Sequence, residues 1–475
     1  MPFDAFRKLQ TPSDPRLQLA PAPPRCSEGC QGWVVVGCYP DPTIHQKQLG
    51  HVHDRLPSDV REQLADIQWP SKEDFQTDKF DAARKGIRSF IACREILTPD
   101  VFHQPLTSAC SMHGTRCQVN SVSQHNNGMS PGWLTQIWAG IICLDYTQFG
   151  NCEGIAGKWS QVNAIFGCER AAKKEAVIAV ECAPQAPIKD MILDGLSETH
   201  TYHDNIICPT TYGFPVKRKR RWVIATRDDR IVMQMSFEDF AMHFRRSLMV
   251  KGTVFYCADE EKVQQALENQ IKSARKKAVK DTDRFSAALF GEAPSWYDTL
   301  SVTQKERLRR AIEINLHRAL ARNCAAGDFI VDLDHNADEV GRMSKNEYAM
   351  VPCLITHGVM WKQSIATDEV SRPMLDEEYF ACQGMGTLPQ HGTMTICPFL
   401  DLLNTMQSKH VKFLTGNGMH AAVVTMLLLW LMSCGEVVVG LRNGSEHISD
   451  LFEEEEGAPL TPISGPAPSK FRRMA

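Results

Sequence analysis

The sequence predicts an α/β fold with a mostly parallel sheet, because three strand-like segments recur and the first two are separated by a helical pattern. Residues 137–142 and 176–180 are short apolar runs, and residues 221–225 form a third. Between the first two runs, residues recur with helical spacing, namely Trp159, Val162, Asn163 and Phe166. A strand, a helix and a second strand in this order are typical of the βαβ unit of parallel sheets.

The other expected elements are less regular. Possible strands are residues 33–36 and 89–92, and residues 233–323 are helical and polar, with residues 263–267 and 308–320 as the clearest helices. The apolar run 421–434 is too short to span a bilayer and predicts a buried core helix, so no membrane partner is expected.

Composition limits the classes of function. At 475 residues the chain is long enough for two or three domains, and its net charge of −4 argues against a basic coat, so any nucleic-acid contact must be local. Residues 272–280 and 305–310 are basic patches that could make such contacts or could be solvated helix faces.

The cysteines favour a reducing compartment. There are seventeen of them, without a disulfide-like spacing or a signal peptide. We predict no metal, because the candidate zinc ligands are irregularly spaced, namely Cys110, His113, Cys117 and His125.

Chemically active side chains follow the three apolar strands. Cys143 ends the first, where an α/β enzyme would hold a nucleophile, and Glu181 ends the second. Arg218 and Arg220 lie in the basic run 217–221 that leads into the third, and their alternation points both to one face of a strand. Each also has an ordinary structural interpretation. Cys143 could be a small buried hydrophobic residue, Glu181 a carboxylate at a helix start, and the basic run 217–221 a solvated face or a nuclear-import patch.

Together the three segments resemble the motifs of the C5-cytosine DNA methyltransferases. The family's Gly-Pro-Pro-Cys-Gln, Glu-Asn-Val and Gly-Val-Pro-Gln-x-Arg-x-Arg correspond to Gly-Ile-Ile-Cys143-Leu, Val-Glu181-Cys and Gly-Phe-Pro-Val-Lys-Arg218-Lys-Arg220. The proline, asparagine and glutamine of the family are replaced here by Ile142, Cys182 and Val216.

Two later segments extend the resemblance. Residues 372–378 with 383–385 resemble Arg-x-x-Thr-x-x-Glu and Gln-Gly-Phe-Pro, and Gly416-Asn417-Gly418 resembles the family's closing Gly-Asn. The resemblance implies a class I S-adenosylmethionine-dependent methyltransferase fold, with cofactor binding at Gly416, Asn417 and Gly418. The family's Phe-x-Gly-x-Gly cofactor loop is not found between Met1 and Ala139.

The resemblance also implies a reaction. Cys143 would add to C6 of a flipped-out cytosine, Glu181 would hold the proton for N3, and Arg218 and Arg220 would bind the base oxygen and a phosphate. A methyl group from S-adenosylmethionine would then reach C5. The expected partner is DNA, with RNA as an alternative, and a catalytically silent nucleic-acid-binding relative is a further alternative.

These patterns divide the chain into five parts. Residues 1–32 form a disordered N-terminal segment, 33–232 the catalytic α/β domain, 233–345 a helical insert in the place of a target-recognition region, 346–448 the C-terminal part of the catalytic domain, and 449–475 an acidic, proline-rich tail. A nuclear location is expected in a eukaryote and a cytoplasmic one otherwise. The sequence predicts neither the target site nor the oligomeric state.

Overall fold

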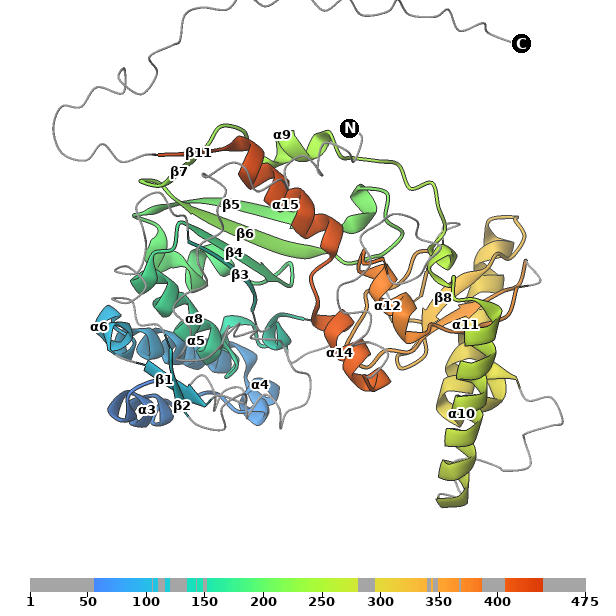
Figure 1. Ribbon diagram of the computed structural model, residues 1–475. Coiled ribbons are helices and arrows are strands. Elements are labelled where there is room, and N and C mark those ends of the chain that lie inside the picture. The colour runs from blue at the N-terminus through green and yellow to red at the C-terminus, as the bar shows by residue number, and fades with distance from the viewer. Residues whose placement is uncertain are drawn as a thin grey trace, which may run out of the picture. The chain divides into compact units, whose positions relative to one another are not determined.

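A computed structural model describes residues 55–104, 106–109, 116–119, 135–141, 143–147, 152–280, 295–339, 343–344, 349–366, 369–386 and 406–438 (Figure 1). Several expectations lie outside these ranges: the N-terminal segment, the strand at residues 33–36, Cys110, His113, His125, Ile142 and the acidic tail.

The main sheet has four strands in the order β3-β4-β6-β5. Their bounds are β3 Gln136–Gly140, β4 Val177–Cys182, β5 His200–Ile207 and β6 Arg220–Arg227. β3 and β4 are parallel, whereas β6 is antiparallel to both β4 and β5, so three strands share one direction. The predicted α/β class is confirmed, and the described sheet is mixed, with one parallel and two antiparallel strand pairings. The reversed strand arises because β5 and β6 form a hairpin, with β6 inserted beside β4.

The two faces of this sheet are buried against different helices, as Figure 1 shows. Along β4, Ile178 and Val180 pack in the cluster that includes Phe166 of α8 (Ser160–Lys173), whereas Val177 and Ala179 pack in the cluster with Trp430. Trp430 belongs to α15 (Ala421–Cys434), which shares that face with α9 (Phe237–Met242). Because both faces are covered, β4 reads as a continuous apolar run.

Helices precede the sheet. They are α3 Ser58–Ala65, α4 Lys72–Thr77, α5 Lys79–Ile96 and α6 Pro99–His103, followed by a hairpin of β1 Leu106–Ala109 and β2 Arg116–Val119. The strand expected at residues 89–92 is therefore wrong. Asp78 caps α5 by accepting from the backbone N–H groups of Phe80 and Asp81. The buried residues Ala82, Gly86, Ser89, Phe90 and Cys93 follow a helical period that four residues alone could not reveal.

The region after β6 contains a second, three-stranded sheet. Its strands are β8 Phe329–Asp332, β9 Met360–Gln363 and β10 Arg372–Pro373, in the order β10-β9-β8, all antiparallel. The helices around it are α10 Glu260–Lys280, α11 Val302–Ala321, α12 Asp376–Cys382 and α14 Ser408–Asn417. The two helices predicted at residues 263–267 and 308–320 are confirmed as parts of α10 and α11. The sheet joins strands from both sides of the predicted boundary at residue 345.

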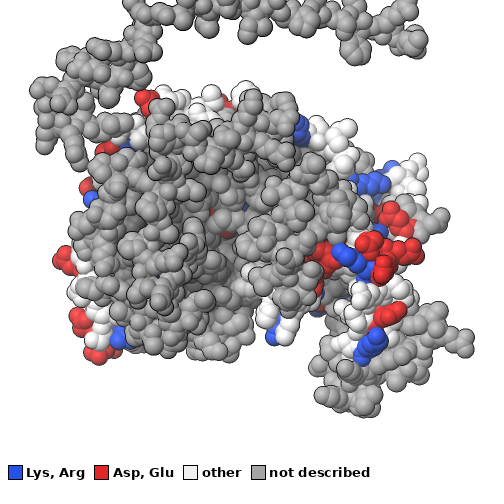
Figure 2. Space-filling view, in the orientation of Figure 1, with Lys and Arg blue, Asp and Glu red and all other residues white. Residues whose placement is uncertain are grey.

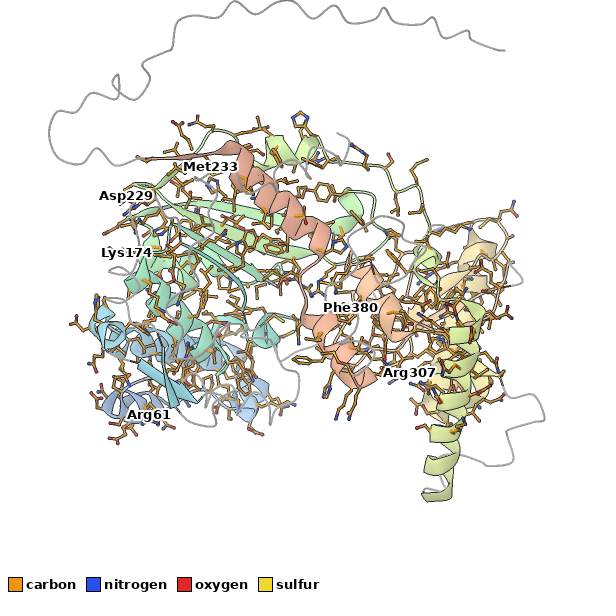
Figure 3. The ribbon with its side chains drawn as sticks, viewed as in Figure 1. Arg61, Lys174, Asp229, Met233, Arg307 and Phe380 are labelled. Carbon is orange, nitrogen blue, oxygen red and sulfur yellow. The ribbon has the colours of Figure 1, made fainter. Side chains whose placement is uncertain are left out.

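The last core helix, α15, matches the apolar run predicted to be helical. Val423, Leu427 and Trp430 are buried against the main sheet, whereas Met432 is exposed. After α15, β11 (Gly435–Val437) pairs with β7 (Ile231–Met233), and Met233 lies beside this end of the helix (Figure 3).

By length and composition, the stretch Ser408–Cys434 could cross a membrane. In this fold the stretch forms two helices, because α14 ends at Asn417 and α15 begins at Ala421. Core helices of this length and composition meet the same criterion.

Candidate active site

Cys143 and Glu181 lie at the same edge of the main sheet. The parallel register pairs Gly140, the last residue of β3, with Glu181 in β4, and the Ile141 N–H donates to the Glu181 carbonyl at 3.1 Å. Cys143 follows two residues later and opens a single 3-10 turn, in which the Tyr146 N–H donates to the Cys143 carbonyl at 2.9 Å. Chain order and sheet topology thus bring a half-buried thiol and a buried carboxylate to adjacent carboxyl ends of parallel strands.

Arg220 joins Glu181 to a residue from a distant part of the chain. Its Nε lies 2.9 Å from Glu181 Oε1, and an Nη donor lies 3.7 Å from Cys353 Sγ. Burial alone would lower the pKa of Arg220, but the acidic groups of Cys353, Glu181 and Cys143 raise it above its ordinary value. A permanent positive charge therefore lies among two thiols and one carboxylate.

Arg218 is bound to the protein itself. It donates to the carbonyl of Leu354 at 3.4 Å, to that of Gly416 at 3.1 Å and to that of Gly418 at 2.6 Å, and its side chain is buried. Burial and the neighbouring charge of Arg220 lower its pKa. Its Nη donors therefore hold the turn after α14 against the start of β6.

The alternation predicted for the basic run is present. Arg218 and Arg220 point inward, while Lys217 and Lys219 are exposed. The chain around Val351 runs beside this segment, because the Lys217 N–H donates to the Val351 carbonyl at 2.9 Å. This pairing brings residues 353 and 354 to the two arginines.

A second cysteine, Cys182, lies beside the site but is fully buried. Burial, together with the nearby Cys143 and Glu181, raises the pKa of the Cys182 thiol well above its ordinary value. A thiol held protonated in this way is a poor nucleophile, so Cys143 is the better candidate of the two.

Gly140 leaves open space beside the carboxylate. A Cβ placed on it would lie 3.6 Å from Glu181 Oε2 and 3.8 Å from Met419 Cε. These are ordinary contacts, so the glycine is not required by a clash. Its missing side chain leaves a space beside Oε2 and Met419 Cε that a methyl group would fill.

The three residues predicted to bind the cofactor lie where α14 ends, three to five residues before α15 begins at Ala421. A Cβ on Gly416 would lie 2.4 Å from the Thr356 amide nitrogen, and one on Gly418 would lie 2.8 Å from the Leu414 carbonyl. Both glycines are therefore needed for packing. Asn417 differs, because its buried Nδ2 has no hydrogen-bond partner among the described residues. The described site thus fits S-adenosylmethionine at one point, the Asn417 amide.

The segment that resembles Arg-x-x-Thr-x-x-Glu forms a buried ion pair. The two Nη atoms of Arg372 donate to the two carboxylate oxygens of Glu378 at 2.7 and 2.8 Å, and both residues are buried. Gln383, in the next segment, donates from Nε2 to the Thr415 carbonyl. These contacts connect β10 and α12 to α14, so their role in the described structure is to fix the fold.

In the basic patch at residues 305–310, two arginines are paired with nearby carboxylates. Arg309 pairs with Glu306 and Glu313, and Arg310 pairs with Asp338 at 3.2 Å. In the face shown in Figure 2, charged side chains of both signs are intermixed where the described residues are coloured. The interpretation of this patch as a solvated helix face is therefore favoured. In the other patch, the side chains of residues 275–280 lie outside the described set.

Two residues of the site could not be predicted from a motif. Cys353 reaches Arg220 only through the pairing of the Val351 segment with the start of β6. His420 is buried beside Arg218, its ring nitrogens lack hydrogen-bond partners among the described residues, and burial and the arginine charge lower its pKa to about 3. It is therefore neutral, and it packs edge-on against Phe214 at 5.0 Å between ring centroids.

Comparison with known proteins gives structural similarity alone. No protein-family model matches the chain, and no curated protein matches it by sequence. Among solved structures, it is similar to the methyltransferase EhMeth of Entamoeba histolytica, with 11% identity, 66% of this chain and 81% of that chain covered, and a TM-score of 0.35. It is also similar to the Dnmt2 methyltransferase of S. pombe, with 10% identity, coverage of 74% and 95%, and a TM-score of 0.35.

A third similar structure is a putative DNA modification methyltransferase encoded within a prophage of E. coli. It has 12% identity and a TM-score of 0.32, with 63% of this chain and 78% of that chain covered. These values are too low to assign a residue or a reaction.

Proposed function

We propose that this chain methylates C5 of cytosine in DNA through a covalent bond between Cys143 and C6. The observation that carries the proposal is that Cys143 and Glu181 lie at neighbouring carboxyl ends of parallel strands, with Arg220 paired to Glu181 at 2.9 Å. The sequence motifs suggest the reaction type, and a thiol, a carboxylate and a guanidinium group at one edge of the sheet support it.

Cys143 is the nucleophile in this proposal. C5 of cytosine becomes nucleophilic only after a thiolate adds to C6 and converts the ring into an enamine. The positive charge of Arg220, which interacts with Cys143, would favour the thiolate over the thiol. Addition forms the sulfur–C6 bond and moves the electron pair of the C5–C6 double bond toward C5.

Glu181 and Arg220 handle the charge that develops on the ring. Glu181 Oε1 is held by Arg220, and Oε2 borders the space above Gly140. A carboxyl group in that position would hold the proton at N3 as the ring is attacked. Arg220 keeps its charge throughout, so it would orient Glu181 and bind the base oxygen.

Arg218 and Asn417 have supporting roles. Arg218 donates to the Gly416 and Gly418 carbonyls and thereby holds Asn417 in place. The Asn417 amide would hydrogen-bond to S-adenosylmethionine, which would supply the methyl group for C5. Loss of the C5 proton would then restore the C5–C6 double bond and expel the Cys143 thiolate. Because C6 is inaccessible within a duplex, the target base must be flipped out before Cys143 can reach it.

Two alternatives follow from particular observations. The same Cys and Glu chemistry would serve cytosine in RNA, whose single-stranded bases are already accessible. A catalytically silent nucleic-acid-binding protein is favoured by the replacement of motif residues by Cys182 and Val216. It is also favoured by a candidate cofactor site for which the described residues supply one unpartnered amide, that of Asn417.

An assay for the covalent adduct between the protein and the base tests the proposal. Purified protein is incubated with S-adenosylmethionine and single-stranded or duplex DNA that carries 5-fluorocytosine, and with the matching RNA. Fluorine cannot leave C5 as a proton does, so methyl transfer should leave a covalent complex that survives denaturing electrophoresis. Cys143→Ser should form none, and Cys353→Ser should form it.

Other outcomes contradict parts of the proposal. An adduct that persists in Cys143→Ser but is lost in Cys353→Ser would make Cys353 the nucleophile. An adduct with RNA alone would change the substrate, and no adduct with either nucleic acid would support the silent alternative.

A further inference from the structure

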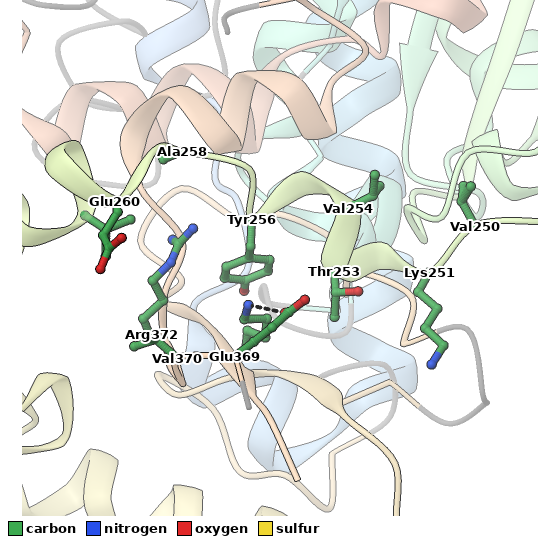
Figure 4. Close-up of a pocket in the computed structure, with 12 residues that line it drawn as sticks. Val250, Lys251, Thr253, Val254, Tyr256, Ala258, Glu260, Glu369, Val370 and Arg372 are labelled. Atoms are coloured by element: carbon green, nitrogen blue, oxygen red, sulfur yellow. Dashed lines mark hydrogen bonds and ion pairs between the residues drawn. The ribbon is translucent and has the colours of Figure 1, made fainter. Parts of the chain in front are cut away.

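Two adjoining cavities lie in the second sheet region. The larger, drawn in Figure 4, has a volume of about 620 Å³, and the smaller has a volume of about 550 Å³. They share Glu260, Val263 and Val370 in their walls. Neither is lined by Cys143 or Glu181. Each is large enough to hold a small organic molecule.

The larger cavity contains a buried cationic and polar group of side chains. Tyr256 lies at its centre in Figure 4, with Lys362 Nζ 5.5 Å and Arg372 Cζ 5.2 Å from the ring centroid. Tyr256 is 8% exposed, and its hydroxyl group has no hydrogen-bond partner among the described residues. A buried hydroxyl without a partner costs free energy, which a bound acceptor would recover.

The two cations differ in how firmly they are paired. Arg372 is held by both oxygens of the buried Glu378. Lys362 is 4% exposed, and its Nζ is held at 2.8 Å by Glu369, whose side chain is 59% exposed. An exposed carboxylate can rotate into solvent at little cost, so an incoming anion could replace Glu369 on a buried ammonium group.

The smaller cavity is aromatic and apolar. Its walls include Trp296, Trp361, Leu308 and Ile312. The Trp361 Nε1–H donates to Gln363, but the Trp296 Nε1–H is buried without a partner among the described residues, and Trp296 is 3% exposed. This cavity therefore offers a flat apolar wall and one unused donor, which suit a planar heterocycle with a ring acceptor.

We propose that the two cavities together bind one nucleotide of the nucleic-acid strand, other than the target cytosine. The phosphate displaces Glu369 and is bound by Lys362 and the Tyr256 hydroxyl. The base enters the smaller cavity and accepts a hydrogen bond from Trp296. Every base has a hydrogen-bond acceptor, either a ring nitrogen or a carbonyl oxygen, so this contact anchors a strand without reading its sequence. The inference rests on the proposed function only in taking the ligand from a nucleic acid.

Affinity measurements on charge variants test the site. Fluorescence anisotropy of a labelled single-stranded DNA is recorded with the full chain and four variants. Lys362→Met should weaken binding by about tenfold, because it removes one charge-assisted hydrogen bond to the phosphate. Tyr256→Phe should weaken it less, because its hydroxyl is neutral.

Glu369→Gln should tighten binding, because it removes the anion that competes for Lys362. Glu261→Gln is the matched control. It removes the same charge from an exposed position one residue from Glu260, outside both cavities, and should leave the affinity unchanged.

The outcomes separate this proposal from the proposed function. The nucleotide site would be overturned if Lys362→Met bound single-stranded DNA as tightly as the parent. It would also be overturned if Glu369→Gln and Glu261→Gln changed the affinity equally, whatever the adduct assay gives. Affinities that follow the prediction without any fluorocytosine adduct would keep the site and reject the catalytic proposal. Deoxycytidine monophosphate and deoxycytidine serve as competitors. If the free monophosphate competes as well as the unlabelled strand, the ligand is a free nucleotide and the strand-anchoring role is overturned.

Discussion

Replacing Glu378 by glutamine should destabilise the fold more than any exposed charge change. The carboxylate accepts four hydrogen bonds. Two come from Arg372, one from the Ala258 N–H at 2.9 Å and one from the Leu375 N–H at 2.8 Å. Both Glu378 and Arg372 are buried, so no water can replace the lost acceptor.

The magnitude follows from what a glutamine can retain. Its single oxygen can keep the contacts on one side, while its amide group faces an arginine donor and a backbone N–H on the other. Breaking one side of a buried ion pair leaves an uncompensated charge and costs about 3–5 kcal/mol of unfolding free energy. Replacing Arg372 and Glu378 together by methionine should recover only part of this, since the Ala258 and Leu375 N–H groups would still lack their acceptor.

Urea unfolding followed by near-ultraviolet circular dichroism measures the effect. The matched control is Glu377→Gln on the same helix, where the carboxylate is partly exposed and lies 3.6 Å from Lys262. That change should cost less than about 1 kcal/mol. The reasoning is refuted if the two variants unfold at the same urea concentration.

The remaining predictions concern His420 and two glycines. His420 has a pKa of about 3 in the fold, below its ordinary value, so the unfolded chain takes up a proton first as pH falls. The stability it contributes is complete above about pH 6.5 and is lost as pH falls toward 3. Between about pH 6 and 4, the free energy of unfolding measured with urea should therefore fall by about 1.4 kcal/mol per pH unit less in His420→Phe than in the parent. An equal fall in the two proteins would contradict this. Gly140→Ala should unfold like the parent, because its methyl group makes only ordinary contacts, but it should slow adduct formation by filling the space beside Glu181. Gly167→Ala would place a Cβ 1.9 Å from the Ile192 carbonyl and should cost roughly 1–3 kcal/mol, so equal stability of the two glycine variants would count against the packing described.

The strands that carry the site were predictable because each is an apolar run with a polar end. The apolar runs that begin at residues 137 and 176 overlap β3 (Gln136–Gly140) and β4 (Val177–Cys182), and the residues from Trp159 to Phe166 predicted α8 between them. The reversed direction of β6 was not predictable, because an apolar run does not indicate whether its strand pairs in a parallel or an antiparallel way. β5 was missed because only His200 and Ile207 are buried along it, so its sequence lacks an apolar run.

The partners of the site residues were harder to predict from the sequence than the strands that carry them. The motif arginines look alike in the sequence, yet Arg218 binds backbone carbonyls while Arg220 binds Glu181. That division depends on residues 353 to 418, which no local pattern relates to the basic run. The same distant segments bring Cys353 and Met419 to the site, and the pairing of Lys362 with an exposed carboxylate likewise depends on tertiary structure.

The exchange of the C5 hydrogen of cytosine tests the central claim most directly, because it needs the nucleophile and not the methyl donor. When Cys143 adds to C6, the enamine takes a deuteron from D₂O at C5, loses the original proton and releases the thiolate. Mass spectrometry of the recovered oligonucleotide would count the deuterium. We expect exchange with the parent protein, none with Cys143→Ser, and slower exchange with Glu181→Gln, which still binds the strand. Exchange that continues in Cys143→Ser, or fails in the parent although the strand is bound, would contradict the assignment of Cys143 as the nucleophile.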